Sequence, residues 1–234
     1  DERDAGTLAG ELDGLALALT QAAAVIKKRR LSFAEYLADW HARRDEMLDD
    51  QDFDPTRTGY RWTVAVTWRT SYDQLPEASR FVFDLLAWLA PSPIPERFVT
   101  KPWSEKLLAR LPEAIRATIR TEPQRLLLPL YDYSLAEPPL GTQRLFTIHR
   151  LIQEVGRLWQ KREPAHAALC RELVVDLVAR DLDRPDTLDN LILNILPELR
   201  AAAPHAEWLL EGQNPPVAPQ VAARLAYSLA DLEQ

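Results

Sequence analysis

The residue best placed for chemistry is His149, which lies where an extended apolar stretch meets a helical pattern. Residues 145–148 read Leu-Phe-Thr-Ile, and apolar side chains then recur at helical spacing from 151 to 159. A side chain at such a junction can be held by the strand and face a cleft at the start of the helix. It can then sense a ligand there. The alternative is a boundary histidine that caps the helix or covers the core, and position alone favours this alternative.

The other reactive residue types are not spaced for catalysis or metal binding. Cys170 is the only cysteine and lies in a helical run, so we expect a small buried side chain. Four histidines and one cysteine show no zinc-ligand spacing. No glycine-rich loop is followed by lysine and serine or threonine, which is the phosphate cradle of P-loop enzymes. We therefore expect no catalytic residue, no metal and no independent enzyme in this chain.

The composition predicts a mainly α-helical fold. The 234 residues include 7 glycines and 18 prolines, and good helix formers dominate. The net charge of −7 disfavours a phosphate-binding surface, and the one basic run, residues 27–30, ends an apolar helix, where cations complement the helix dipole. No apolar stretch of 18 residues and no signal peptide occur, so we expect a cytoplasmic protein. The chain begins without methionine, and we expect it to be an excised fragment.

Changes in pattern divide the chain into four parts. Residues 1–50 predict a helical bundle: a helical unit over 7–30 is interrupted at Asp13-Gly14, and Ser32 with Glu35 forms a capping box for the next helix. Residues 51–61 are acidic and turn-rich, which is typical of a linker. Residues 62–162 predict a winged-helix domain, and residues 163–234 predict a helical linker leading into repeats.

The winged-helix prediction rests on the order of elements. Helices are expected over 62–75, from Pro76 to about 89, from Ile94-Pro95 through 99, and over 103–111 and 112–121. A β-hairpin then follows, in which residues 133–136 pair with the strand 145–148 across the turn 137–142. This small hairpin is the expected wing.

Successive helices are expected to fill the C-terminal part. Proline or an acidic residue opens most of them, which predicts helices over 165–180, 185–201, 204–211 and 219–232, with a break at 214–216. Helical hairpins of this size are typical of the entry to an α-solenoid, although no clean repeat period is present.

Five segments, in order, resemble the NB-ARC or STAND class of signal-transducing ATPases. Residues 14–19 resemble the glycine-leucine-proline-leucine-alanine-leucine helix, and residues 32–37 resemble the serine-x-x-x-tyrosine-leucine helix that follows it. Residues 68–76 and 81–95 resemble the start and continuation of the family's winged helix. Residues 146–155 resemble the methionine-histidine-aspartate signature, in the histidine-arginine-leucine form of the bacterial branch that precedes TPR-like repeats. The resemblance covers roughly residues 8 to 160.

This resemblance implies a regulatory part of a molecular switch. In the family's resting form, ADP lies between the P-loop domain and the winged helix, and the signature histidine, here His149, contacts its β-phosphate. ATP exchange then releases the winged helix and allows oligomerisation. The implied nucleotide-facing residues are Gly14, Leu15, Ala16, His149 and Arg150.

Two of these positions depart from the family pattern. Ala16 replaces the proline that packs on adenine, and Arg150 replaces the aspartate after the histidine. The fragment itself is expected to hold no cofactor. ADP or ATP with Mg would belong to the full-length protein, whose P-loop domain would lie upstream of Asp1. The implied partners are that upstream domain and the downstream repeats of the same protein, with self-oligomerisation on activation and no membrane partner.

Two other functions stay open. A winged-helix transcriptional regulator would place a recognition helix within residues 112–130, but the acidic and leucine-rich character of that segment is more typical of a packing helix. A helical adaptor or scaffold would need no nucleotide at all. An intact P-loop in the parent gene would exclude the scaffold, and a salt-dependent mobility shift with duplex DNA would support the regulator.

Overall fold

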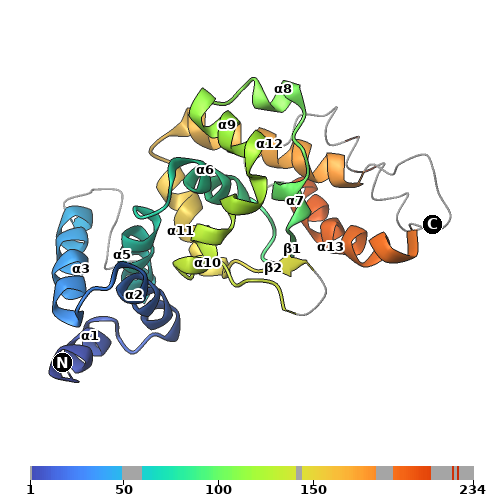
Figure 1. Ribbon diagram of the computed structural model, residues 1–234. Helices are drawn as coiled ribbons and strands as arrows, with labels where there is room; N and C mark the ends of the chain where they lie inside the picture. Colours follow the sequence, from blue (N-terminus) through green and yellow to red (C-terminus); the bar gives the residue numbers. More distant parts are fainter. Residues whose placement is uncertain are drawn as a thin grey trace.

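Good helix formers and scarce glycine produce the mainly helical fold that the composition predicts. The computed structural model describes residues 2–48, 60–140, 144–182 and 192–211, together with the single positions 223 and 226. Figure 1 shows the N-terminal helices at one end of the molecule and the short sheet with the C-terminal helix α13 at the other.

Among the described residues, the N-terminal bundle is formed by the helices α1 (Glu2–Glu11), α2 (Ala16–Arg29), α3 (Phe33–Leu48) and α5 (Tyr60–Tyr72). The predicted capping box is confirmed, because the Ser32 amide donates to Glu35 Oε2 at 2.7 Å and the Glu35 amide donates to Ser32 Oγ at 3.2 Å. Most of the predicted linker lies outside the described residues, but its end is wrong, since α5 already begins at Tyr60.

The middle of the chain is built from short helices and two short strands. In order they are α6 (Glu77–Leu86), β1 (Ile94–Pro95), α7 (Arg97–Thr100), α8 (Glu105–Leu108), α9 (Glu113–Thr121), the 3₁₀ helix η1 (Pro123–Leu126), α10 (Leu128–Asp132), β2 (Leu145–Phe146) and α11 (Arg150–Gln160). The helices expected over 103–111 and 112–121 are present in shortened form.

The pairing of the strands corrects two predictions. β2 pairs antiparallel with β1, with Ile94 opposite Phe146, so Ile94-Pro95 is a strand and not the start of a helix. Pro95 disfavours α geometry at the residue before it, and its missing N–H suits an edge strand. Residues 133–136 form a turn after α10, with Ser134 at a φ of 52°, and do not form a strand. A single bridge between Glu137 and Thr147 extends the sheet on that side.

The C-terminal part described is one helical pair, α12 (Pro164–Leu182) and α13 (Ile192–Leu210). The predicted helix boundary before Pro204 is wrong, because Pro204 lies inside α13. Buried side chains continue at helical spacing through this proline, and packing therefore maintains the helix, at Ala202, His205, Ala206 and Leu209. The expected start at 185, the break at 214–216 and the helix over 219–232 lie outside the described helices.

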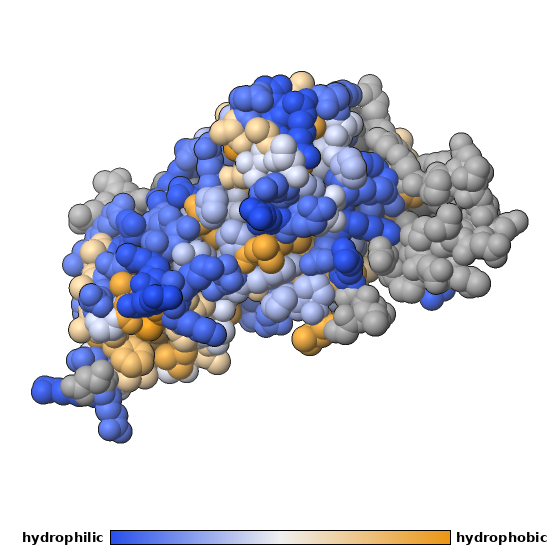
Figure 2. Space-filling view, viewed as in Figure 1, coloured by the Kyte–Doolittle hydropathy of each residue, from blue (hydrophilic) through white to orange (hydrophobic). Residues whose placement is uncertain are grey.

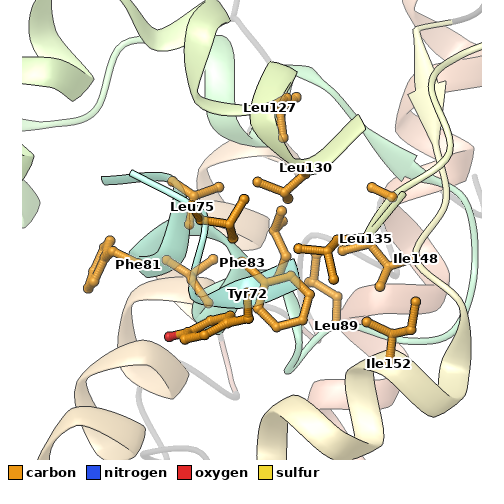
Figure 3. Packing of buried hydrophobic residues seen from close by; sticks show 14 of the residues in the cluster. Tyr72, Leu75, Phe81, Phe83, Leu89, Leu127, Leu130, Leu135, Ile148 and Ile152 are labelled. Carbon is orange, nitrogen blue, oxygen red and sulfur yellow. The ribbon is translucent and has the colours of Figure 1, made fainter. Parts of the chain in front are cut away.

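A shared core joins the middle part to α11 and α5. Figure 3 shows Phe83 and Leu89 facing Leu135, Ile148 and Ile152 across this core, with the hydroxyl oxygen of Tyr72 pointing away from the apolar cluster. The strand-to-helix segment that carries His149 is therefore anchored from both sides, through Ile148 before it and Ile152 after it.

Candidate functional site

His149 caps helix α11. Its φ of −59° and ψ of 133° are non-helical, and its Nδ1 accepts a hydrogen bond from the Leu151 amide at 3.2 Å. The capping interpretation of this residue is thus confirmed. The ring is also exposed, and because Nδ1 acts as an acceptor, the neutral imidazole carries its proton on Nε2. An N–H donor is therefore presented to solvent at the start of a helix.

Helix α11 is held rigidly against α6 behind His149. The Gln153 amide nitrogen donates to the carbonyl oxygens of Leu86 and Leu89 at 3.3 and 3.2 Å. Gly156 faces Phe83 so closely that a Cβ on this glycine would lie 2.9 Å from the ring. Arg150, the first residue of the helix, is exposed. The outward position of His149 is therefore fixed by buried contacts one to two turns further along α11.

Gly14, Leu15 and Ala16 form the entry to helix α2. Gly14 has a φ of 63°, which other residues adopt only with strain, and it follows Asp13 at 53°. The turn is tied to α5, since the Thr63 hydroxyl donates to Asp13 Oδ2 at 2.9 Å. Gly14 and Ala16 are exposed and Leu15 is half-buried. A Cβ on Gly14 would meet open space, so the positive φ, and not close packing, accounts for a glycine at this turn.

The sequence-predicted residues occupy two separate places. Within the described part of the chain, no hydrogen bond or ion pair links residues 14–16 to His149 or Arg150. Helices α2 and α11 both pack on α5, but α11 does so near its C-terminal end, where Trp159 contacts Trp68 at 5.9 Å between ring centres. At 1.5 Å per residue, His149 lies about 15 Å further along that helix. The described contacts therefore do not bring residues 14–16 together with His149 and Arg150.

A buried polar cluster was missed by the sequence reasoning. The Tyr72 hydroxyl donates to Asp84 Oδ2 at 2.8 Å, and His166 Nε2 lies 2.9 Å from the same oxygen. Burial raises the pKa of Asp84, while the hydrogen bond to Asp84 raises the pKa of His166. The one sequence signal was an acidic residue inside the apolar run 81–86, which is unusual for a helix buried along most of its length.

This cluster does not form a nucleophilic site. Cys170 Sγ lies 3.5 Å from His166 Nε2, the same nitrogen that contacts Asp84, so the ring cannot relay a proton between the two groups. Cys170 is fully buried, as predicted, and burial raises the pKa of its thiol well above the usual range. Among the residues that the structure describes, no group of three or more histidine, cysteine or acidic side chains is arranged to hold a metal ion.

The contacts of the predicted recognition segment weigh against the DNA-binding alternative. The three arginines of the predicted recognition segment each pair with a glutamate, in the ion pairs Arg116–Glu113, Arg120–Glu105 and Arg125–Glu122. These exposed pairs reduce the net positive charge that the segment presents, which weighs against phosphate binding there.

Comparison of the chain with protein-family models, with curated proteins and with solved structures finds no match in any of the three. None of the helices in the described residues has the length and apolar character needed to cross a membrane. The family resemblance therefore rests only on the five sequence motifs.

Proposed function

We propose that this chain is the regulatory part of a nucleotide-dependent switch of the NB-ARC or STAND type, in which His149 reads the phosphates of a nucleotide held by a neighbouring P-loop domain. The observation that supports this most strongly is the geometry of His149. Its Nδ1 is occupied by the cap, its Nε2–H is free to donate, and its ring is exposed at a helix start.

Three features at the same place favour a phosphate as the ligand. The start of α11 carries the positive end of the helix dipole, which attracts anions. The imidazole Nε2–H supplies a neutral hydrogen-bond donor, and the exposed Arg150 adjoins it with a positive charge. In the family, the aspartate after the histidine restrains the imidazole ring. In this proposal Arg150 stands at that position and does not restrain the ring, because the Leu151 amide already holds it through Nδ1.

Helix α2 supplies a surface for the neighbouring domain. Its exposed side chains are small toward its start, at Ala16, Thr20 and Ala23, and are cations at its end, at Lys27, Lys28 and Arg29. Several larger apolar residues beside them are only half-buried, including Leu17, Leu19 and Ile26. Figure 2 shows apolar residues gathered over the part of the molecule where Figure 1 draws α1 and α2. Such a face permits close approach of another domain.

The proposed switch depends on a contact between two domains, namely the hydrogen bond from His149 to the phosphate. A hydrogen bond from His149 to a phosphate on another domain exists in only one domain arrangement. A nucleotide that makes this contact therefore favours the closed arrangement by the free energy of the contact, and a nucleotide that does not make it allows opening.

The first test is genetic. The proposal requires a P-loop segment encoded upstream of residue 1 in the same gene, and a parent gene without one refutes it. In the polypeptide that carries both parts, ADP affinity is then measured by calorimetry for the wild type, His149→Ser and His149→Ala. Serine retains the helix cap, whereas alanine removes both the cap and the imidazole.

Both variants are expected to bind ADP about tenfold to a hundredfold more weakly, because a hydrogen bond to a charged phosphate contributes about 1.5–3 kcal/mol. Only His149→Ala should also lose thermal stability. His41→Ser on α3 is the matched control and should bind ADP as the wild type does. Unchanged ADP affinity in His149→Ser would remove the assigned role of this residue.

A further inference from the structure

A pocket of about 520 Å³ opens between α5, α6, α9, α11 and α12, away from His149. Its volume lies within the range of small-molecule sites. Because its walls come from the N-terminal bundle, the middle part and α12, an occupant would contact all three. The buried cluster of Tyr72, Asp84 and His166 forms one side of it.

Arginine side chains supply the positive charge of the pocket. Arg69 is neutralised by Asp73 at 2.9 Å, and its guanidinium lies 4.2 Å from the ring centre of Trp159. Arg162 lies over the same indole at 3.6 Å. Arg80 differs, because its hydrogen bonds go to the carbonyl oxygens of Leu75 and Asp73, at 2.9 and 3.1 Å, and to no carboxylate among the described residues. Its Nη1 group is left to bind an anion.

Carboxylates face these cations across the pocket. Glu77 and Glu163 line the rim and are exposed. Glu163 directly precedes α12, three residues before His166, and its charge raises the pKa of both Asp84 and His166. Asp84 itself is already engaged by two hydrogen bonds. Glu163 is therefore the group best placed to receive a ligand cation.

Apolar side chains line the remaining wall. Phe81, Ile115, Trp159 and Leu169 face the same space from α6, α9, α11 and α12. The pocket thus combines the guanidinium of Arg80, which has no carboxylate partner among the described residues, with two exposed carboxylates and an apolar surface. A purely anionic ligand would meet the repulsion of Glu77 and Glu163, and a purely cationic ligand would meet three arginines.

We infer that this pocket binds a small zwitterion, an α-amino acid with an apolar side chain, whose carboxylate pairs with Arg80 and whose ammonium group pairs with Glu163. The side chain of the ligand packs on Ile115 and Leu169. This site is independent of nucleotide sensing by His149, and its occupant would fix α5 relative to α12.

The test is isothermal titration of the chain at pH 7 with four probes: L-phenylalanine, L-leucine, N-acetyl-L-phenylalanine and L-phenylalanine methyl ester. The two free amino acids should bind saturably with one site per chain. The N-acetyl derivative lacks the ammonium group and the ester lacks the carboxylate, so each should bind at least about tenfold more weakly than L-phenylalanine, as expected for the loss of one charge-assisted hydrogen bond.

Two variants test whether the amino acid binds in this pocket or at another surface. Glu163→Gln is exposed and should fold normally, yet it should weaken L-phenylalanine binding about tenfold. Glu207→Gln, an equally exposed change on α13, should leave binding unchanged. Absence of saturable binding by either amino acid overturns the inference. Equal binding of phenylalanine and its N-acetyl derivative, or unchanged binding in Glu163→Gln, overturns it as well.

Discussion

Acidification is expected to destabilise the protein through His205. This side chain is fully buried in α13, where its Nε2 lies 3.1 Å from the carbonyl oxygen of Pro93 and its ring packs edge-on against Phe98 at 5.7 Å. Burial lowers the pKa of His205 from 6.5 to about 4, and the hydrogen bond to Pro93 opposes that shift only in part. Protonation would also place a charge where Nδ1 has no partner within the described structure.

The sign of the effect follows from proton binding in the two states. The unfolded chain takes up a proton on this ring near pH 6.5, whereas the folded chain does so only near pH 4. Between these values the unfolded state holds more protons, so stability falls as the pH falls. Each pKa unit corresponds to about 1.36 kcal/mol, so the full loss is about 3 kcal/mol, of which about 2 kcal/mol has developed by pH 5. Below pH 4 both states are protonated and the loss no longer grows.

The assay is urea unfolding of the wild type and His205→Gln at several pH values from 7 to 4.5. Buried Asp84 and Asp181 have raised pKa values and act in the opposite direction, so only the difference between the two proteins isolates His205. That difference should shrink by about 2 kcal/mol between pH 7 and pH 5. His41→Gln, at a half-exposed histidine, is the control. Parallel pH profiles for the wild type and His205→Gln would refute the reasoning, and so would a His205 pKa near 6.5 in an NMR titration of the wild type.

Three further substitutions test the packing and the capping of the fold. Gly156→Ala should lower the free energy of unfolding by about 1–2 kcal/mol in urea titrations, because the new Cβ would lie 2.9 Å from the Phe83 ring; a gain in stability would contradict this close approach. Ser32→Ala should lower the melting temperature by a few degrees through loss of about 1 kcal/mol of capping, and Ser32→Asp should restore it. Asp181→Ala should lower the free energy of unfolding by about 3 kcal/mol in urea titrations. The guanidinium of Arg97 lies 2.6 Å from Asp181 Oδ2 and would lose this buried carboxylate. A decrease below about 1 kcal/mol would show that water already screens the pair.

Local patterns predicted the helices well and the strand pairing poorly. Apolar spacing and a proline at the first turn identified α6 and α9, and the capping box identified the start of α3. The partner of β2 was predicted wrongly because β1 lies far away in the sequence, and the two-residue strand Ile94-Pro95 has no alternating pattern of its own. The continuation of α13 through Pro204 was hidden for a similar reason, since it depends on what His205 and Ala206 pack against.

Prediction of the candidate site was limited in the same way, by contacts between residues that are far apart in the sequence. The position of His149 between a strand and a helix could be predicted, since both neighbouring patterns are local. Its cap to the Leu151 amide was one of two interpretations, and geometry was needed to choose. The cluster of Tyr72, Asp84 and His166 could not be predicted, because its three members come from three different helices and no short motif connects them.

Two polar pairs, one near each end of helix α12, explain why this helix adopts a single rotation about its own axis. The helix buries apolar side chains around most of its circumference, and apolar surface alone would accept several rotations. Near its start, His166 meets Asp84 on α6, and at its end Asp181 meets Arg97 on α7. Successive helix positions differ by about 100°, so a shift of α12 by one residue would separate His166 from Asp84 and Asp181 from Arg97. The loss measured for Asp181→Ala therefore reports how strongly one rotation of α12 is preferred, as well as the strength of a single ion pair.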